Sequence, residues 1–282
     1  MIDTSILSAV TFVYFLSFLF YFMYMMRRKE AWGRTANMTA LVGLVAHTLA
    51  LALRWIESYR LGIGHVPLSN FYESLIFFAW AVVFLYLIIE WLTENRIPGV
   101  FTMPVAYIFM IYASFSPDVS NRIQPLIPAL QSNWLIGHVV ACFMGYAAFA
   151  IAFAISIMYM LKEMIGKGKE GQSFLGFLPA ICILDELIYQ SVVLGFTMLS
   201  LGIITGSVWA HNAWGSYWNW DPKETWSLIT WLIYAALLHI RLIHSKWWGR
   251  RTAVLAIIGF LSALFTYLGV NYLPGLHSYL KL

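Results

Sequence analysis

Eight long apolar runs recur along this chain, and they constrain its fold more than any other feature of the sequence. Each run can cross about 30 Å of hydrocarbon as a helix that rises about 1.5 Å per residue. Only 11% of the residues are charged, against about 25% in soluble domains. The sequence therefore predicts an all-α polytopic membrane protein with a single integral-membrane domain, residues 1–282. Its eight expected spans are 5–26, 36–56, 71–91, 99–115, 136–162, 190–210, 225–244 and 252–272.

The distribution of Lys and Arg predicts the orientation of these spans. With the N-terminus outside, eleven of the 17 Lys and Arg residues fall in inner loops, five fall on the outer side, and Arg241 lies at the inner end of the seventh span. Because short inner loops are enriched in these residues, both termini are expected to face outward, toward a periplasm or an equivalent lumen. The first run lacks a basic leading segment and a small-residue cleavage site, so we expect a permanent span. The net charge of +4 then reports orientation, and no nucleic-acid partner is expected.

One long inner loop and one aromatic outer loop connect the later spans. The inner loop, 163–189, ends in the mixed stretch FLPAICILDELIYQ, which is typical of an interfacial helix and suggests a connecting role. The outer loop, 206–224, contains WGSYWNWDPKET, with Trp214, Trp218 and Trp220 close together. Six of the 13 Trp residues of the chain lie between residues 209 and 231.

The outer loop has a structural interpretation and a binding interpretation. Asp221 is a good N-cap, Pro222 suits the first helical position, and Glu224 completes a capping box, so this stretch could simply start the seventh span. The Trp residues could form an interfacial aromatic belt. Alternatively, they could form a platform for a flat, apolar ligand, with Gly215 allowing close approach to the backbone.

Histidines are the second set of candidate functional residues. Two of those on the outer side, His138 at the start of the fifth span and His277 after the eighth, flank the aromatic loop at about the same depth. Two imidazoles could therefore approach one ligand from opposite sides, although interfacial histidines are also commonly solvated or capping residues. Ionisable groups inside spans are functional candidates, with a hydrogen-bonded structural role as the alternative. The remaining histidines considered are His65 and His211 on the outer side, and His47 and His239 within spans.

The outer segment GIGHVPLSNFYESLIF, residues 62–77, precedes and begins the third span. Asn70 and Glu73 have capping-box spacing, which predicts the start of a helix. The segment also places His65 and Tyr72 on the same side of the membrane as the aromatic loop.

Four ordered segments carry a resemblance to a known family. WGSYWNWDPKETW, preceded by VWAHNA and followed by ITWLIYAALLHIR, resembles the WWD motif of haem-handling membrane proteins. RWIESYRLGIGHVPLSNFYESLIFFAW, LIPALQSNWLIGHV and GVNYLPGLHSY resemble, in the same order, the CcsA (ResC) family of system II cytochrome c biogenesis. The likeness extends from about residue 41 to residue 279.

The resemblance implies a function and a set of partners. Members of this family work with a CcsB (ResB) membrane protein to carry haem b across the membrane as cargo. They present reduced haem to apocytochromes c bearing C-x-x-C-H, and the chain would be the haem-handling subunit of a cytochrome c haem lyase. Thiol-reducing proteins and membrane lipid are further expected partners. The membrane would be a bacterial inner membrane or a thylakoid membrane.

The resemblance also implies roles for particular residues. His138 and His277 match the pair that ligates haem iron at the outer site, and His239 matches the ligand of an earlier, within-membrane haem. The aromatic loop would hold the macrocycle, through Trp214, Gly215, Tyr217, Trp218, Trp220 and Asp221. Cations considered for the haem propionates are Lys223, Arg54 and Arg60. Weaker candidates for haem contact are His47, His65 and His211.

Three alternative functions remain open from the sequence. A CcmC-like or CcmF-like protein of system I would share the WWD loop and its flanking histidines. A membrane electron-transfer subunit would bind haem or quinone, and would be expected to have paired histidines on two helices at both membrane depths. A transporter without haem would use its intramembrane histidines to relay protons.

Overall fold

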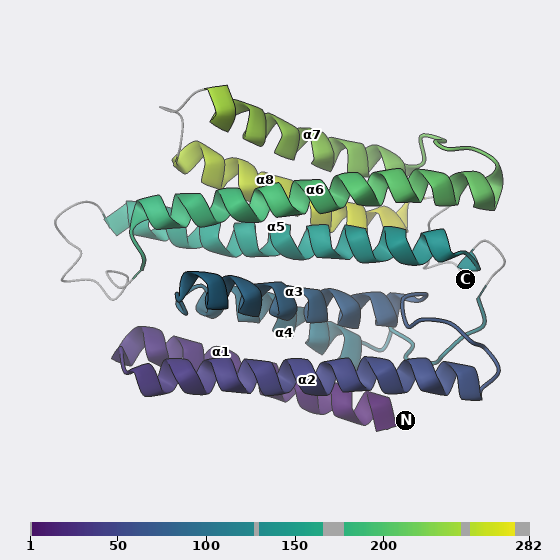
Figure 1. Ribbon diagram of the computed structural model, residues 1–282, viewed down its shortest axis with the longest axis horizontal. Coiled ribbons are helices and arrows are strands. Elements are labelled where there is room, and N and C mark those ends of the chain that lie inside the picture. Colours follow the sequence, from purple (N-terminus) through teal and green to yellow (C-terminus); the bar gives the residue numbers. More distant parts are fainter. Residues whose placement is uncertain (1, 127–129, 166–177, 244–248, 274–282) are drawn as a thin grey trace. The chain divides into compact units, whose positions relative to one another are not determined.

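The computed structural model describes residues 2–126, 130–165, 178–243 and 249–273 (Figure 1). Within this part of the chain, regular structure is helical and no β-strand occurs. The helices are α1 (Ile2–Arg27), α2 (Glu30–Arg60), α3 (Phe71–Thr93), α4 (Gly99–Phe115), α5 (Asn133–Ile165), α6 (Ile181–Trp214), α7 (Pro222–Ile243) and α8 (Arg250–Tyr267), followed by the short 3₁₀ helix η4 (Gly269–Tyr272).

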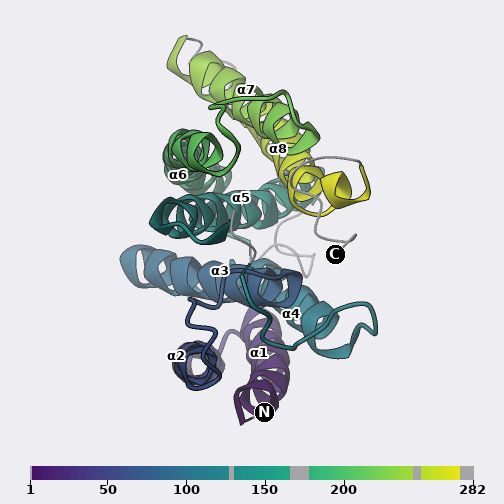
Figure 2. The same cartoon turned by 90° about the vertical axis from the view of Figure 1, so that its right-hand side faces the viewer.

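The helices form two compact units, with the division after residue 130. In the first unit, α1 packs along α2 and α4, and α3 packs along α4. In the second unit, α5 packs along α6 and α8, and α7 packs along α8 (Figure 2). Consecutive helices within each unit run in opposite directions (Figure 1), as expected for a chain that crosses a membrane repeatedly.

Seven of the described helices are long and apolar enough to cross a membrane. The eighth, α4, is also apolar but has 17 residues, which corresponds to about 25 Å at 1.5 Å per residue. Each of the eight expected spans lies within one of these helices, except that α7 ends at Ile243 and the eighth span continues from α8 through η4. The prediction of an all-α polytopic membrane protein is confirmed.

The start of α3 shows the capping predicted from its sequence. The backbone N–H of Glu73 donates to the Asn70 side chain at 2.8 Å. The Glu73 carboxylate accepts in return from the backbone N–H of Ser69 at 2.9 Å, one residue earlier than in the usual capping box. The loop before α3 is therefore fixed at its junction with the helix.

Part of the expected inner loop 163–189, residues 166–177, lies outside the described residues. Residues from Ile181 onward are continuous with α6, a helix of 34 residues, and do not form a separate helix. The polar residues at the start of this helix have partners inside the unit. The Asp185 carboxylate accepts from the Arg241 guanidinium at 2.8 Å and from the Gly249 backbone N–H at 3.1 Å. These bonds join the start of α6 to the end of α7 and the residue before α8, so the polar groups are paired within the unit.

Candidate functional site

The aromatic loop is shorter and more constrained than the 206–224 segment expected from the sequence. Helix α6 continues to Trp214 and α7 starts at Pro222, which leaves residues 215–221 as the loop. Gly215 adopts a left-handed conformation with φ of 79°, and its N–H donates to the carbonyl of His211 at 2.9 Å. This is the usual glycine termination of a helix. The first residue of the loop is therefore fixed by the end of α6.

The other end of the loop is fixed by the predicted cap of α7. The Asp221 carboxylate accepts from the Lys223 backbone N–H at 3.2 Å. Glu224 accepts from the backbone N–H groups of Asn219 at 2.7 Å and Asp221 at 3.3 Å. Asp221 therefore caps the helix while also holding the loop, so a structural role and a role in ligand binding are compatible.

The loop exposes a set of aromatic rings. Trp220 is 69% exposed and Tyr217 is 56% exposed. Trp218 meets Trp220 edge to face at 5.7 Å between ring centroids, and Tyr217 stacks on His211 at 4.2 Å. Trp220 also has a φ of 56°, a left-handed conformation that costs a non-glycine residue about 1–2 kcal/mol. Exposed aromatic surface and a strained backbone are both characteristic of binding sites.

A second row of rings connects the end of α6, where the loop begins, with His138. Trp214 meets Trp209 edge to face at 4.8 Å, and Trp209 stacks on the His138 imidazole with centroids 6.0 Å apart and planes 13° apart. Trp209 is only 2% exposed. The structure thus brings together two predicted site residues, Trp214 and His138, through Trp209. The only sequence signal for Trp209 was its place in the Trp-rich stretch.

The His138 side chain has a defined hydrogen-bonding geometry. Its Nδ1 lies 2.7 Å from the carbonyl oxygen of Gly202 on α6. A carbonyl can only accept, so Nδ1 must carry a proton, and the neutral ring then has its lone pair on Nε2. This is the arrangement in which an imidazole typically ligates a metal, with the opposite N–H held by a backbone carbonyl.

The three cations considered for the haem propionates have different surroundings. Lys223 lies in the first turn of α7, where its backbone N–H donates to the Asp221 carboxylate. On α5, the Cys142 sulfur lies 3.6 Å from His138 Nδ1. Arg60, in the other unit, has a side chain that is 74% exposed and lies 3.8 Å from the Glu57 carboxylate.

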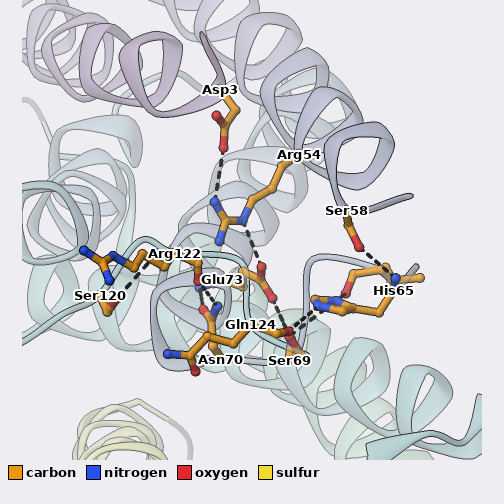
Figure 3. A network of polar contacts seen from close by, with 11 residues as sticks. Asp3, Arg54, Ser58, His65, Ser69, Asn70, Glu73, Ser120, Arg122 and Gln124 are labelled. Carbon is orange, nitrogen blue, oxygen red and sulfur yellow. Dashed lines mark hydrogen bonds and ion pairs between the residues drawn. The ribbon is translucent and has the colours of Figure 1, made fainter. Parts of the chain in front are cut away.

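Arg54 lies in a buried polar network within the first unit (Figure 3). Its guanidinium donates to Asp3 at 3.1 Å and to Glu73 at 2.9 Å, and its side chain is 2% exposed. Glu73 in turn accepts from the hydroxyl of Ser69 at 2.8 Å. Arg54 therefore joins α1, α2 and α3, and this placement favours a structural role over contact with a propionate.

His65 is also part of this network (Figure 3). Its ring nitrogens lie 2.9 Å from the Val66 carbonyl and 3.0 Å from the Gln124 carbonyl, and its backbone N–H donates to Ser58 at 2.8 Å. The ring joins the segment before α3 to the segment after α4. Its placement favours a structural role as well.

The two histidines within spans have opposite surroundings. His47 on α2 is buried, and its Nδ1 lies 3.1 Å from the Tyr14 hydroxyl on α1. His239 on α7 is exposed on the surface of the second unit. It could therefore meet a partner or cargo in the membrane without rearrangement of α7. His277, the expected second outer ligand, lies outside the described residues.

Comparisons with known proteins identify the family of the chain. The family model described as "Cytochrome C assembly protein" matches residues 68–277. Proteins named "Cytochrome c biogenesis protein CcsA" from Pyropia yezoensis and Parasynechococcus marenigrum are 40% and 41% identical to the chain. Each alignment covers 88% of this chain and 87% of the relative.

A solved structure shares the fold. The protein named "Cytochrome c Heme Lyase CcmF" matches with a TM-score of 0.66 and 15% sequence identity. The match covers 95% of this chain, which spans only 50% of that larger chain. The family model and the CcsA relatives together confirm the resemblance seen in the sequence: the chain belongs to the cytochrome c assembly protein family, and within it to the CcsA family.

Proposed function

We propose that this protein acts in cytochrome c biogenesis, where it receives haem as cargo and presents it for covalent attachment to apocytochrome c. Membership of the CcsA family supports the pathway. The observation that carries the proposal is the connection between His138 and the exposed aromatic loop through Trp209. These contacts support His138 as an axial ligand beside a hydrophobic platform for a flat macrocycle.

His138 and His277 would ligate the haem iron at the outer site. The carbonyl of Gly202 holds the His138 proton on Nδ1, which supports ligation through Nε2. Two imidazoles would fill both axial positions and exclude oxygen. Release to the cytochrome requires the histidine of C-x-x-C-H to replace one of them.

The exposed rings of Trp220 and Tyr217 would contact the porphyrin face, with Trp218 and Trp214 beneath them and Gly215 and Asp221 shaping the loop. Lys223, in the first turn of α7, is the proposed partner of the propionates. During attachment each cysteine S–H adds across one vinyl C=C, so a C–S bond forms and the hydrogen passes to the other vinyl carbon. No net oxidation occurs, and the protein contributes position while haem and thiols supply the reactivity.

A CcsB-like membrane partner completes the proposed lyase. The exposed position of His239 supports its role as a ligand to haem within the membrane, with the second ligand supplied by that partner. His47 is a weaker candidate because it is buried beside Tyr14. The protein would act in a bacterial inner membrane or a thylakoid membrane.

Co-expression in a host without its own cytochrome c maturation system tests this proposal. The host would carry this chain, a CcsB partner and a reporter apocytochrome c, and haem staining would measure covalent attachment. We expect the His138→Gly and His277→Gly variants to lose most attachment. His211→Gly should reduce attachment less, because it removes a ring that stacks on Tyr217 but no proposed ligand of the iron. Normal attachment in both of the first two variants would refute the outer site. A requirement for a system I haem chaperone would instead favour a CcmC-like or CcmF-like role.

A further inference from the structure

The surroundings of His138 contain more than the hydrogen bond to Gly202. Trp209 stacks on one face of the imidazole at 6.0 Å. On the α6 backbone, Gly206 provides the space for the ring: a Cβ atom at this position would lie 2.4 Å from His138 Nδ1 and 2.7 Å from its Cε1. No side chain could occupy that position without displacing the imidazole.

These contacts restrict different motions of the same ring. The Gly202 carbonyl fixes the direction of the Nδ1–H group, at 2.7 Å. The Trp209 face limits tilting of the ring plane, and Trp209 is itself held by the edge of Trp214 at 4.8 Å. Backbone and aromatic contacts of this kind orient metal ligands and set which nitrogen is available.

We propose that Trp209 and Gly206 are positioning residues for the outer haem, because they hold the His138 ring in one orientation with Nε2 directed to the iron. This inference rests on the function proposed above and deepens it. Trp209 also links the ligand to the end of α6, where the aromatic loop begins, since it contacts both His138 and Trp214.

The first test uses haem-free protein, so that its result does not depend on the haem proposal. Protein labelled with ¹⁵N-histidine would be studied by NMR in detergent, and the His138 signals assigned by their loss in His138→Gln. We expect a neutral ring with its proton on Nδ1. In Gly206→Ala and Trp209→Leu this tautomer should become mixed, whereas Trp209→Phe should largely restore it because an aromatic face remains.

The second test uses the same variants loaded with haem. We expect outer-site haem affinity to fall by about tenfold to 100-fold in Gly206→Ala and Trp209→Leu, the usual effect of removing the support of a metal ligand. The electron paramagnetic resonance spectrum of the ferric haem should also broaden, because it depends on the orientation of the axial imidazole planes. Loss of stability alone would reduce the haem content without this broadening.

Gly195→Ala is the matched control. Gly195 lies on the same helix and faces α5, and a Cβ there would lie 2.4 Å from Phe149 Cε1, as close as the clash at Gly206. Phe149 is eleven residues along α5 from His138, about 16 Å at 1.5 Å per residue. The control should therefore disturb the packing of the two helices without changing the tautomer or the resonance spectrum.

The outcomes separate this inference from the proposed function. Unchanged affinity and spectra in Gly206→Ala and Trp209→Leu, with haem lost in His138→Gly, would overturn the inference and leave the function standing. A proton on Nε2 in the haem-free protein, or equal spectral changes in Gly195→Ala, would also overturn the inference. Outer haem retained in His138→Gly would refute the proposed haem site. The positioning role of Trp209 and Gly206 would then be refuted as well.

Discussion

The backbone of Trp220 allows the stability of the loop to be separated from its function. Trp220 has a φ of 56° and is 69% exposed, with a ring contact to Trp218. Both Trp220→Ala and Trp220→Gly remove that contact, so its loss cancels when the two variants are compared. Glycine relieves about 1–2 kcal/mol of left-handed strain that alanine retains. Its greater freedom in the unfolded chain offsets about 0.4–1 kcal/mol of this gain.

We therefore expect Trp220→Gly to be more stable than Trp220→Ala by about 1 kcal/mol, although both lack the exposed ring. The free energy of unfolding would be measured by denaturation with SDS in mixed micelles, and bound haem by visible absorption. Both variants should lose outer-site haem and retain any haem bound through His239. A Trp220→Ala variant that is more stable than Trp220→Gly by about 0.4–1 kcal/mol would refute the left-handed backbone. Normal outer haem in Trp220→Gly would show that the ring is not needed, and parallel loss of both haem pools would indicate a folding role for the loop.

Four further variants test other parts of the structure. Glu73→Ala should lower the free energy of unfolding by about 3–5 kcal/mol, because it leaves the buried Arg54 guanidinium with one carboxylate partner. Glu57→Ala removes the partner of an exposed pair and should lower it by about 0–1 kcal/mol. SDS denaturation would compare the two variants, and equal losses of stability would contradict the buried network. Gly259→Ala should lower the free energy of unfolding by about 1–3 kcal/mol in the same assay, because its Cβ would lie 2.6 Å from Tyr234 Cζ. An unchanged free energy of unfolding would contradict the close packing of α7 and α8. His239→Gln should leave the unfolding transition unchanged because the side chain is exposed, but should remove within-membrane haem from the complex with the partner, as measured by visible absorption.

The sequence was most informative about the helices. Long apolar runs identify spans because lipid allows no unpaired backbone, and this predicted the positions of all eight helices. The sequence did not predict that α6 would begin at Ile181, because Asp185 and Glu186 resemble the polar face of an interfacial helix. Their partner, Arg241, lies more than fifty residues later, and the ion pairs exist only once α6 and α7 pack together.

The candidate site was partly predictable for a similar reason. His138 and the aromatic loop stand out by residue type and expected depth, and the capping of α7 follows from local spacing. The contacts of His138 with Gly202, Gly206 and Trp209 could not be predicted, because they depend on how α5 packs against α6. Arg54 was considered for a propionate as an outward cation, but its pairing with carboxylates from two other helices appears only in the folded unit.

The most direct measurement is a reduced-minus-oxidised visible spectrum of the purified protein, with and without its CcsB partner, compared with the His138→Gly variant. We expect sharp bands of low-spin, bis-histidine haem that weaken strongly in the variant, while haem that depends on the partner persists. A folded protein without haem in either preparation, or an identical spectrum from His138→Gly, would contradict the claim that His138 and the aromatic loop form a haem site.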